Sequence, residues 1–141
     1  DGDVAGLCFY HDPGMNFWLA ASHRNGTRQI EIGKTNNGRQ VILNSTKLLT
    51  TDVHLQIRVD GTERATFRFS GDGKSWQKIG DSVYFGDSWR DLRNGRGGDP
   101  DLGWVGIKKR NAWSATTFGV FAVHERGKAK TAEFDFVRVS P

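Results

Sequence analysis

The segment between Tyr84 and Thr117 gathers the residues whose side chains best suit ligand binding. It contains three tryptophans, several arginines and six glycines, and it shows no sustained alternation of apolar and polar residues. Flat aromatic rings pack against the C–H faces of pyranose rings, and planar polar side chains bond pairs of hydroxyl groups. These are the residue types that a sugar-binding surface would need, and the candidate ligand-binding residues are Trp89, Arg90, Asp91, Arg93, Trp104, Lys108 and Trp113.

Each of these tryptophans has a second interpretation, packing in a hydrophobic core, because tryptophan is highly buried on average. Three tryptophans in one charged, glycine-rich segment are harder to bury together. Long irregular loops are uncommon in compact domains and are often functional when they occur. We therefore expect at least one of the three to face a ligand or a partner domain.

A second candidate site surrounds the Pro13-Gly14 pair near the start of the chain. The residues that could contact a ligand there are His11, Asp12, Asn16 and Trp18. The alternative is a polar hairpin loop, since Asp-Pro-Gly is ordinary turn chemistry. This site ranks below the tryptophan-rich segment.

The tryptophan-rich segment also holds acidic side chains with the hard oxygen ligands that Ca²⁺ prefers. A candidate calcium site consists of Asp87, Asp99 and Asp101. The competing interpretation is surface ion pairing with the neighbouring arginines, and the EF-hand calcium loop is absent. The four histidines include no close pair, so zinc is not expected, and we expect no other cofactor.

Nothing in the sequence singles out a catalytic pair. Hydrolysis of a glycoside needs two carboxylates on either side of the scissile bond, but most acids here lie in turns, as Asp60, Asp72 and Asp81 do. No serine lies in the Gly-x-Ser-x-Gly motif that frames a nucleophile. We therefore expect a non-catalytic protein.

Composition argues against several classes of function. A length of 141 residues suits a single domain, and no apolar stretch approaches the roughly 20 residues of a membrane span, so we expect no membrane partner. The net charge of +4 comes from lysines and arginines spread among sixteen acids, which argues against a nucleic-acid partner. Cys8 is the only cysteine, and its apolar neighbours favour a buried thiol over a nucleophile.

Turn signals divide the chain into short strands. Asn25-Gly26, Asn37-Gly38, Asp60-Gly61 and Asp72-Gly73 favour tight turns between antiparallel neighbours. In His54–Asp60 apolar and polar residues alternate with the period of a strand that has one buried face. The expected strands are 5–10, 17–23, 28–34, 39–44, 54–60, 65–70, 118–123 and 132–139. The strand 118–123 is apolar on both faces and is expected to be central. The whole pattern predicts an all-β antiparallel protein, either a sandwich or a barrel, and we expect the sandwich.

Three segments resemble the C-terminal concanavalin A-like domain of family 43 β-xylosidases. Ala65–Gly80, ATFRFSGDGKSWQKIG, is similar to its strand pair Y-Y-S-x-D-G-x-x-W-x-x-I-G. Gly2–Tyr10, GDVAGLCFY, resembles its strand G-D-x-A-G-L-x-x-Y, and Ala132–Val139, AEFDFVRV, resembles its closing strand A-D-F-D-Y-F-R. The three segments lie in the same order and span most of the chain. We expect Trp76, inside the first of them, to lie in the core.

The resemblance implies a concanavalin A-like jelly roll over residues 1–141, attached in relatives to a propeller that hydrolyses xylosides or arabinosides. It implies a non-catalytic module that binds xylan or a related plant polysaccharide and has a catalytic glycosidase domain as its partner. One alternative is a structural accessory domain of a family 43-like β-xylosidase or arabinofuranosidase, without sugar affinity of its own. A second alternative is a free-standing glycosidase.

The sequence departs from the family pattern at its start, where the family's first strands are missing. We therefore expect either a fragment or a sheet that another segment completes. We also expect a secreted or periplasmic protein of bacterial type, although the single cysteine does not decide the compartment.

Overall fold

The computed structural model consists of strands and their connections in the part of the chain that it describes. It describes residues 2–12, 15–36, 39–60, 64–84, 117–124 and 131–140. Within these ranges no helix is long and apolar enough to cross a membrane. The strands are β1 (Asp3–Asp12), β2 (Met15–Arg24), β3 (Thr27–Asn36), β4 (Arg39–Lys47), β5 (His54–Val59), β6 (Arg64–Ser70), β7 (Gln77–Lys78), β8 (Val83–Tyr84) and β9 (Thr117–His124).

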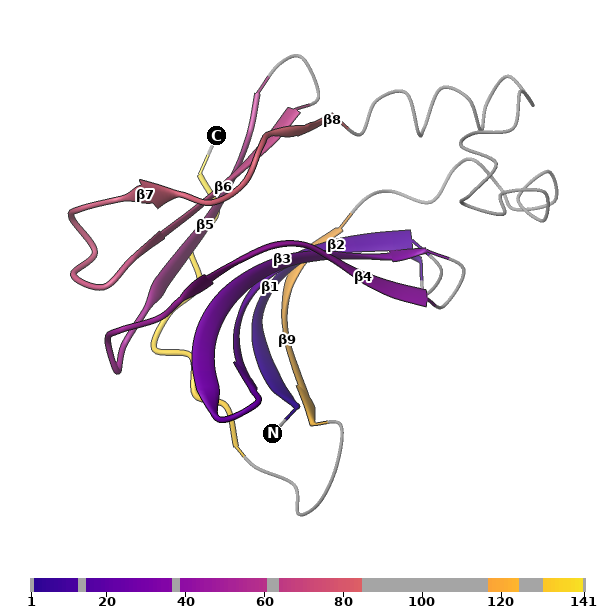
Figure 1. Ribbon diagram of the computed structural model, residues 1–141. Coiled ribbons are helices and arrows are strands. Elements are labelled where there is room, and N and C mark those ends of the chain that lie inside the picture. Colours follow the sequence, from indigo (N-terminus) through magenta and orange to yellow (C-terminus); the bar gives the residue numbers. More distant parts are fainter. Residues whose placement is uncertain are drawn as a thin grey trace, which may run out of the picture.

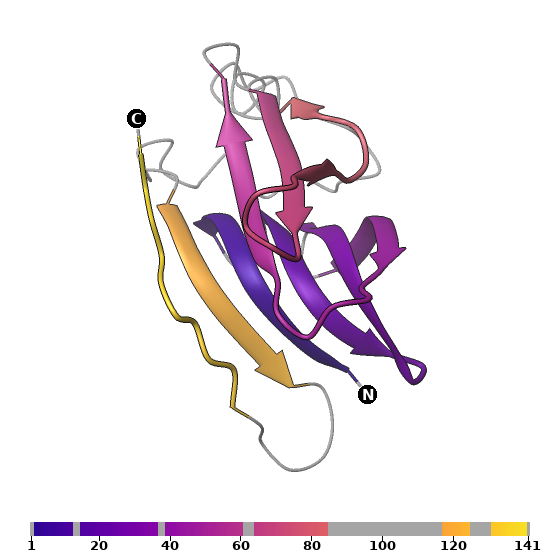
Figure 2. The same ribbon diagram turned by 90° about the vertical axis from the view of Figure 1, so that its left-hand side faces the viewer.

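The strands form two antiparallel sheets that face each other (Figures 1 and 2). Sheet A has the order β4-β3-β2-β1-β9, and sheet B has the order β5-β6-β7 with β8 also paired to β6. The strands from β1 to β4 pair in sequence order, whereas β9 comes from much later in the chain to pair with β1. The predicted all-β antiparallel sandwich is confirmed.

The hydrophobic core lies between the two sheets. Leu19, Ile30 and Ile32 of sheet A and Phe67 of sheet B are fully buried. The other buried members of this cluster are Phe9, Leu48, Ala65, Phe69 and Ile79. Each large apolar side chain contributes about 1.5–3 kcal/mol when it is buried in this way. Because side chains alternate along a strand, the core determines which residues of each strand face outward.

The turn between β2 and β3 folds as its sequence predicts. Asn25 and Gly26 have φ angles of 52° and 72°. Positive φ at both central residues is typical of the two-residue turn that joins antiparallel strands directly. The pair Arg24 and Thr27 closes the ladder immediately outside this turn.

The turn between β6 and β7 is longer than the Asp72-Gly73 pair predicts, since residues 71–76 separate the two strands. The Asp72 carboxylate accepts the backbone N–H groups of Ser75 at 2.7 Å and Lys74 at 2.8 Å. The hydroxyl groups of Ser70 and Ser75 also donate to it, each at 2.8 Å. These bonds hold the pKa of Asp72 well below its usual range. The result is a turn organised by a side chain rather than a tight hairpin.

Sheet A curves so that the face turned away from sheet B is concave (Figure 1). Its edge strand β4 contains an irregularity, because Asn44 pairs with Ile32 whereas Ile42 pairs with Gly33. Leu43 is therefore the extra residue of a β-bulge, which increases the local twist of the edge.

The predicted central position of 118–123 is wrong. β9 lies at the edge of sheet A among the described strands, and it pairs with β1 alone. Phe118 and Val123, on opposite faces of β9, are both exposed. Apolar residues on both faces indicate a central strand only when two neighbours and two layers cover it.

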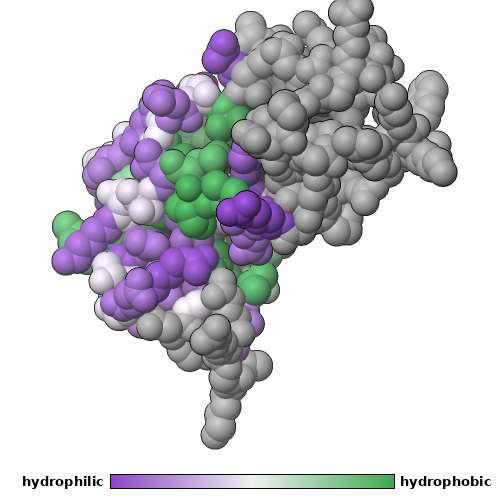
Figure 3. All heavy atoms as spheres, turned by 45° about the vertical axis from the view of Figure 1, so that its right-hand side comes forward, coloured by the Kyte–Doolittle hydropathy of each residue, from purple (hydrophilic) through white to green (hydrophobic). Residues whose placement is uncertain are grey.

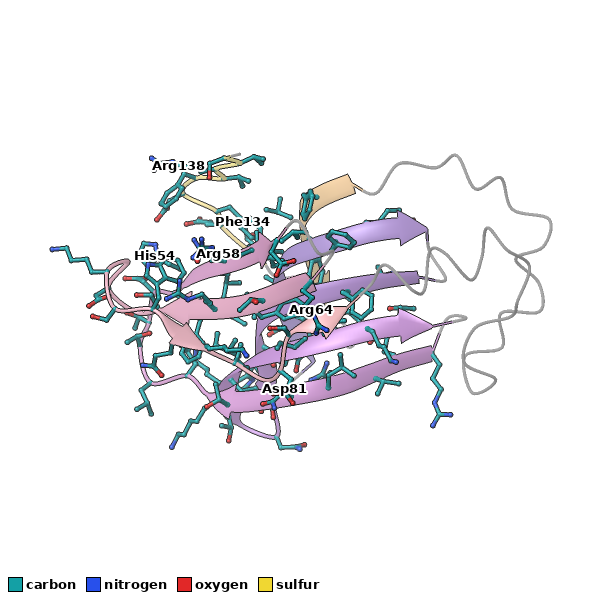
Figure 4. The ribbon with its side chains drawn as sticks, turned by 90° about the horizontal axis from the view of Figure 1, so that it is seen from above. His54, Arg58, Arg64, Asp81, Phe134 and Arg138 are labelled. Atoms are coloured by element: carbon teal, nitrogen blue, oxygen red, sulfur yellow. The ribbon has the colours of Figure 1, made fainter. Side chains whose placement is uncertain are left out.

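The predicted strand at Ala132–Val139 is also wrong, because residues 131–140 contain no strand. The segment nevertheless passes beside β5, where Figure 4 shows Phe134 close to Arg58. The ring centroids of Phe136 and His54 lie 6.1 Å apart. Phe136 and Val137, which would point to opposite faces of a strand, are both exposed, so neither face of the segment is buried. The sequence alternation is present, but the burial that would stabilise a strand is not.

Candidate functional site

The tryptophan-rich segment lies outside the described residues, which stop at Tyr84 and resume at Thr117. The predicted sugar ligands there are Trp89, Arg90, Asp91, Arg93, Trp104, Lys108 and Trp113, and the calcium candidates are Asp87, Asp99 and Asp101. All of these stay predictions. In the ranges that the structure describes, no group of three potential ligands could hold a metal ion.

The second predicted site lies where β1 and β2 meet. The pairing of Asp12 with Met15 brings the backbones of His11, Asp12 and Asn16 to one end of this hairpin. Trp18 lies further along β2 on the concave face of sheet A. The four residues therefore do not form one site, because Trp18 packs in an apolar cluster away from the end of the hairpin.

Trp18 is buried on that concave face. It is 5 % exposed and forms a small apolar cluster with Val4 and Ala20. Its indole covers Gly33, its cross-strand partner on β3, so closely that a Cβ at Gly33 would lie 2.0 Å from Cζ2 of the ring. A sugar ring would reach little of the Trp18 surface.

Glu31 is the only acid of β2 and β3, and it is fully buried on the same face. Arg24 donates to both of its carboxylate oxygens, from Nε at 2.9 Å and from Nη2 at 3.1 Å, and Ser22 Oγ donates at 2.8 Å. Burial by itself would raise the pKa of Glu31, but the bonds from Arg24 and Ser22 and the charge of Arg24 outweigh it and lower the pKa. Glu31 is thus an ionised structural group, unlike the proton donor that glycoside hydrolysis needs.

The outer face of sheet B, which points away from the core, presents three cations from three strands. Arg58 of β5, Arg68 of β6 and Lys78 of β7 share this face, and we call them the basic row. Arg68 lies directly opposite Lys78, and Arg58 lies opposite Thr66. Figure 4 looks onto this side and shows Arg58 on β5 next to the 131–140 segment.

An open hollow of about 400 Å³ lies along the basic row. Its lining consists of Arg58, Val59, Asp60, Thr66, Arg68 and Lys78. Five of these residues are polar or charged, whereas Val59 pairs with the core residue Ala65, so its side chain lies on the opposite face of sheet B from Arg58.

Trp76 stands beside the basic row, so its predicted place in the core is wrong. It is half-buried and belongs to neither core cluster. Arg68 Cζ lies 5.9 Å from the centroid of its ring, and the His54 ring packs edge-on at 6.5 Å. The turn at 71–76 determines this position, because it returns the chain with Trp76 on the same face as Lys78 two residues later.

Nearly the whole chain matches one protein family. Residues 1–140 match the model of the beta-xylosidase C-terminal concanavalin A-like domain. The chain belongs to this family. The resemblance predicted from three short segments is thereby confirmed.

Solved structures show the same fold for this concanavalin A-like domain. It is similar to the GH43 protein BlXynB from Bacillus licheniformis, with a TM-score of 0.62 and 17 % sequence identity, and to a mutant of that protein with the same values. In both cases the match covers 86 % of this chain and 21 % of the solved chain, so the domain spans about a fifth of that protein's length. No curated protein matches the chain.

The sequence prediction missed the basic row. The alternation of β5 and β6 marks Arg58 and Arg68 as outward-facing residues, and this signal was available from the sequence. The position of Lys78 opposite Arg68 was not available, because it depends on the path of the chain through 71–76.

Proposed function

We propose that this concanavalin A-like domain is a non-catalytic accessory domain of a glycoside hydrolase and that it binds xylan or a related plant polysaccharide. Its family, the C-terminal domain of β-xylosidases, supports the accessory role. The observation that supports binding is the hollow of about 400 Å³ on the outer face of sheet B. Small-molecule sites have volumes of about 300–1,000 Å³, and this open hollow lies in the lower part of that range.

The lining of the hollow and the neighbouring Trp76 offer both kinds of contact that a sugar needs. The guanidinium groups of Arg58 and Arg68 are planar donors that bond pairs of oxygen atoms. The half-buried ring of Trp76 beside Arg68 gives an apolar surface for ring C–H groups. Trp76 restricts the motion of Arg68 through the contact between guanidinium and ring, which reduces the entropy lost on binding.

Other parts of the proposal come from the sequence. Trp89, Trp104 and Trp113 extend the binding surface in this proposal, and Asp87, Asp99 and Asp101 would bind calcium. The proposed role also implies export of the domain to the periplasm or the medium, where its polysaccharide is found.

Affinity electrophoresis and titration calorimetry test the binding role. The ligands are xylan, arabinoxylan and cello-oligosaccharides, and the expected result is retardation and heat of binding with xylan or arabinoxylan. The triple variant Trp89→Ala, Trp104→Ala, Trp113→Ala separates the contribution of the tryptophan-rich segment from that of the basic row. Absence of interaction with every ligand would end the binding proposal.

A structural role is the second candidate function, and the concave face of sheet A favours it. Ile42 and Val123 face that side and are 41 % and 48 % exposed. Figure 3 shows an apolar patch among hydrophilic residues on the face of the molecule that it displays. Such a patch suits packing against a catalytic domain. Size-exclusion chromatography after co-expression with a GH43 catalytic domain tests this role, and separate elution without any change in activity would contradict it.

A further inference from the structure

We propose that the basic row binds the carboxylate of a uronic acid carried as a side group on a polysaccharide. This inference rests on the proposed carbohydrate-binding function and narrows it to an acidic sugar. The ligand is a pyranose ring with one carboxylate and several hydroxyl groups.

The basic row places like charges together. Arg68 and Lys78 form a direct cross-strand pair on one face of sheet B, and two positive charges in such a pair destabilise a sheet. Arg58 lies on β5, the strand at the other side of β6, two residue pairs further along the ladder. Within the described part of the chain, no ion pair involves Arg58, Arg68 or Lys78. A ligand carboxylate at this position would offset the repulsion.

Asp60 is the one acid in the lining of the hollow, and its hydrogen bonds go to the backbone of Arg64. Its Oδ1 accepts the backbone N–H of Arg64 at 3.1 Å, and its own N–H donates to the Arg64 carbonyl at 3.1 Å. These bonds close the end of the β5–β6 hairpin. Asp60 therefore lies at one end of the basic row rather than between its cations.

The chemistry of the basic row matches a carboxylate on a sugar ring. A guanidinium group binds a carboxylate through two parallel N–H donors, and Arg68 is already restrained by Trp76. Lys78 adds a point charge on the same side. Thr66 gives the ring itself a polar neighbour on the same face. A neutral sugar would use the same hydroxyl contacts but would leave the three charges without a counter-charge.

The first experiment compares two polymers with one backbone. Glucuronoxylan is tested in affinity electrophoresis beside the same polymer after its uronic carboxyl groups have been reduced to alcohols. Because the charge-assisted hydrogen bonds to the carboxylate are lost, the affinity for the reduced polymer should be lower by a factor of at least about ten. Free glucuronate should compete with glucuronoxylan and should not compete with the reduced polymer.

The second experiment assigns the effect to the basic row. Arg58→Gln, Arg68→Gln and Lys78→Gln should each weaken binding of glucuronoxylan about tenfold and leave binding of the reduced polymer unchanged. Arg39→Gln, an exposed cation on β4 of sheet A, is the matched control and should bind as the wild type does. Thermal unfolding checks the fold, and Arg68→Gln and Lys78→Gln should be at least as stable as the wild type because each removes a like-charge contact.

The outcomes separate this inference from the proposed function. Equal binding of the acidic and the reduced polymer, unchanged in the variants, would overturn the uronate site and leave polysaccharide binding in place. Equal binding of dextran sulfate and glucuronoxylan would also overturn it, since the row would then be a general polyanion surface. Absence of binding to every polysaccharide would overturn both proposals.

Discussion

Arg24 and Glu31 form a two-point ion pair across β2 and β3, with one carboxylate oxygen 2.9 Å from Nε and the other 3.1 Å from Nη2. The Arg24 side chain is 27 % exposed, whereas that of Glu31 is fully buried. The carboxylate is therefore withdrawn from water at a cost that hydrogen bonds to Arg24, Ser22 and Gln29 offset. Because these residues lie on the concave face of sheet A, the pair ties two central strands together there.

We predict that Arg24→Met lowers the free energy of unfolding by roughly 3–5 kcal/mol, because a buried charge loses its partner. Urea unfolding measures this change. Arg39→Met, at an exposed site of β4, is the control and should change stability by no more than about 0.5 kcal/mol. A loss equal to that of the control would show that Glu31 is well solvated without Arg24.

Acid should weaken the fold through Glu31. Its pKa is lower in the folded protein than the ordinary value of 4.5, so the folded state binds the proton less readily than the unfolded state does. The stabilisation is complete above pH 4.5 and is lost as the pH falls through the lower folded value. Glu31→Gln should therefore show a smaller loss of stability over this acid range. Urea unfolding at a series of pH values tests this, and identical acid slopes for both proteins would contradict it.

Gly33→Ala should be strongly destabilising, because the new methyl group would meet the Trp18 ring at 2.0 Å. Overpacking of this kind costs about 1–3 kcal/mol. The control is Gly119→Ala, whose methyl group would contact Cys8 Sγ at 3.6 Å, an ordinary van der Waals distance. Gly33→Ala should cost less stability when it is introduced into the Trp18→Leu variant than when it is introduced into the wild type, because the ring that the methyl group meets is then absent. Denaturant unfolding of the four variants and the wild type measures these changes. A neutral Gly33→Ala would contradict the close packing.

Asp72→Ala should lower the thermal midpoint by several degrees, because the turn at 71–76 loses the acceptor of four hydrogen bonds. Asp72→Asn retains one side-chain oxygen and should lose less. Circular dichroism on heating measures both midpoints. The midpoint of Asp72→Asn should lie above that of Asp72→Ala. Equal midpoints would mean that the side-chain oxygens of residue 72 do not organise the turn.

Most of the strands could be predicted from the sequence, because their alternation reflects burial against a single core. The predicted strand 54–60 agrees with β5 to within one residue, since Leu55 and Ile57 pack on that core. The same alternation at 132–139 failed. A period of two tells which residues share a face, but it does not supply the neighbouring strand or the layer that would bury them.

The candidate site was less predictable than the fold. Trp76 was expected in the core because it lies inside the hairpin motif shared with the family, yet the turn at 71–76 places it on the outer face with Arg68. The opposition of Arg68 and Lys78 depends on strand register, which a single sequence does not reveal. The tryptophan-rich segment lies outside the described residues, so its role stays a prediction.

The β-bulge at Leu43 also affects how copies of the domain meet each other. β4 is an edge strand among the described strands, and its neighbouring residues Val41, Ile42 and Leu43 are exposed. A straight apolar edge offers its unpaired N–H and C=O groups to another chain and promotes aggregation. The extra residue interrupts the regular spacing of those groups, and it thereby protects the edge against strand-by-strand self-assembly.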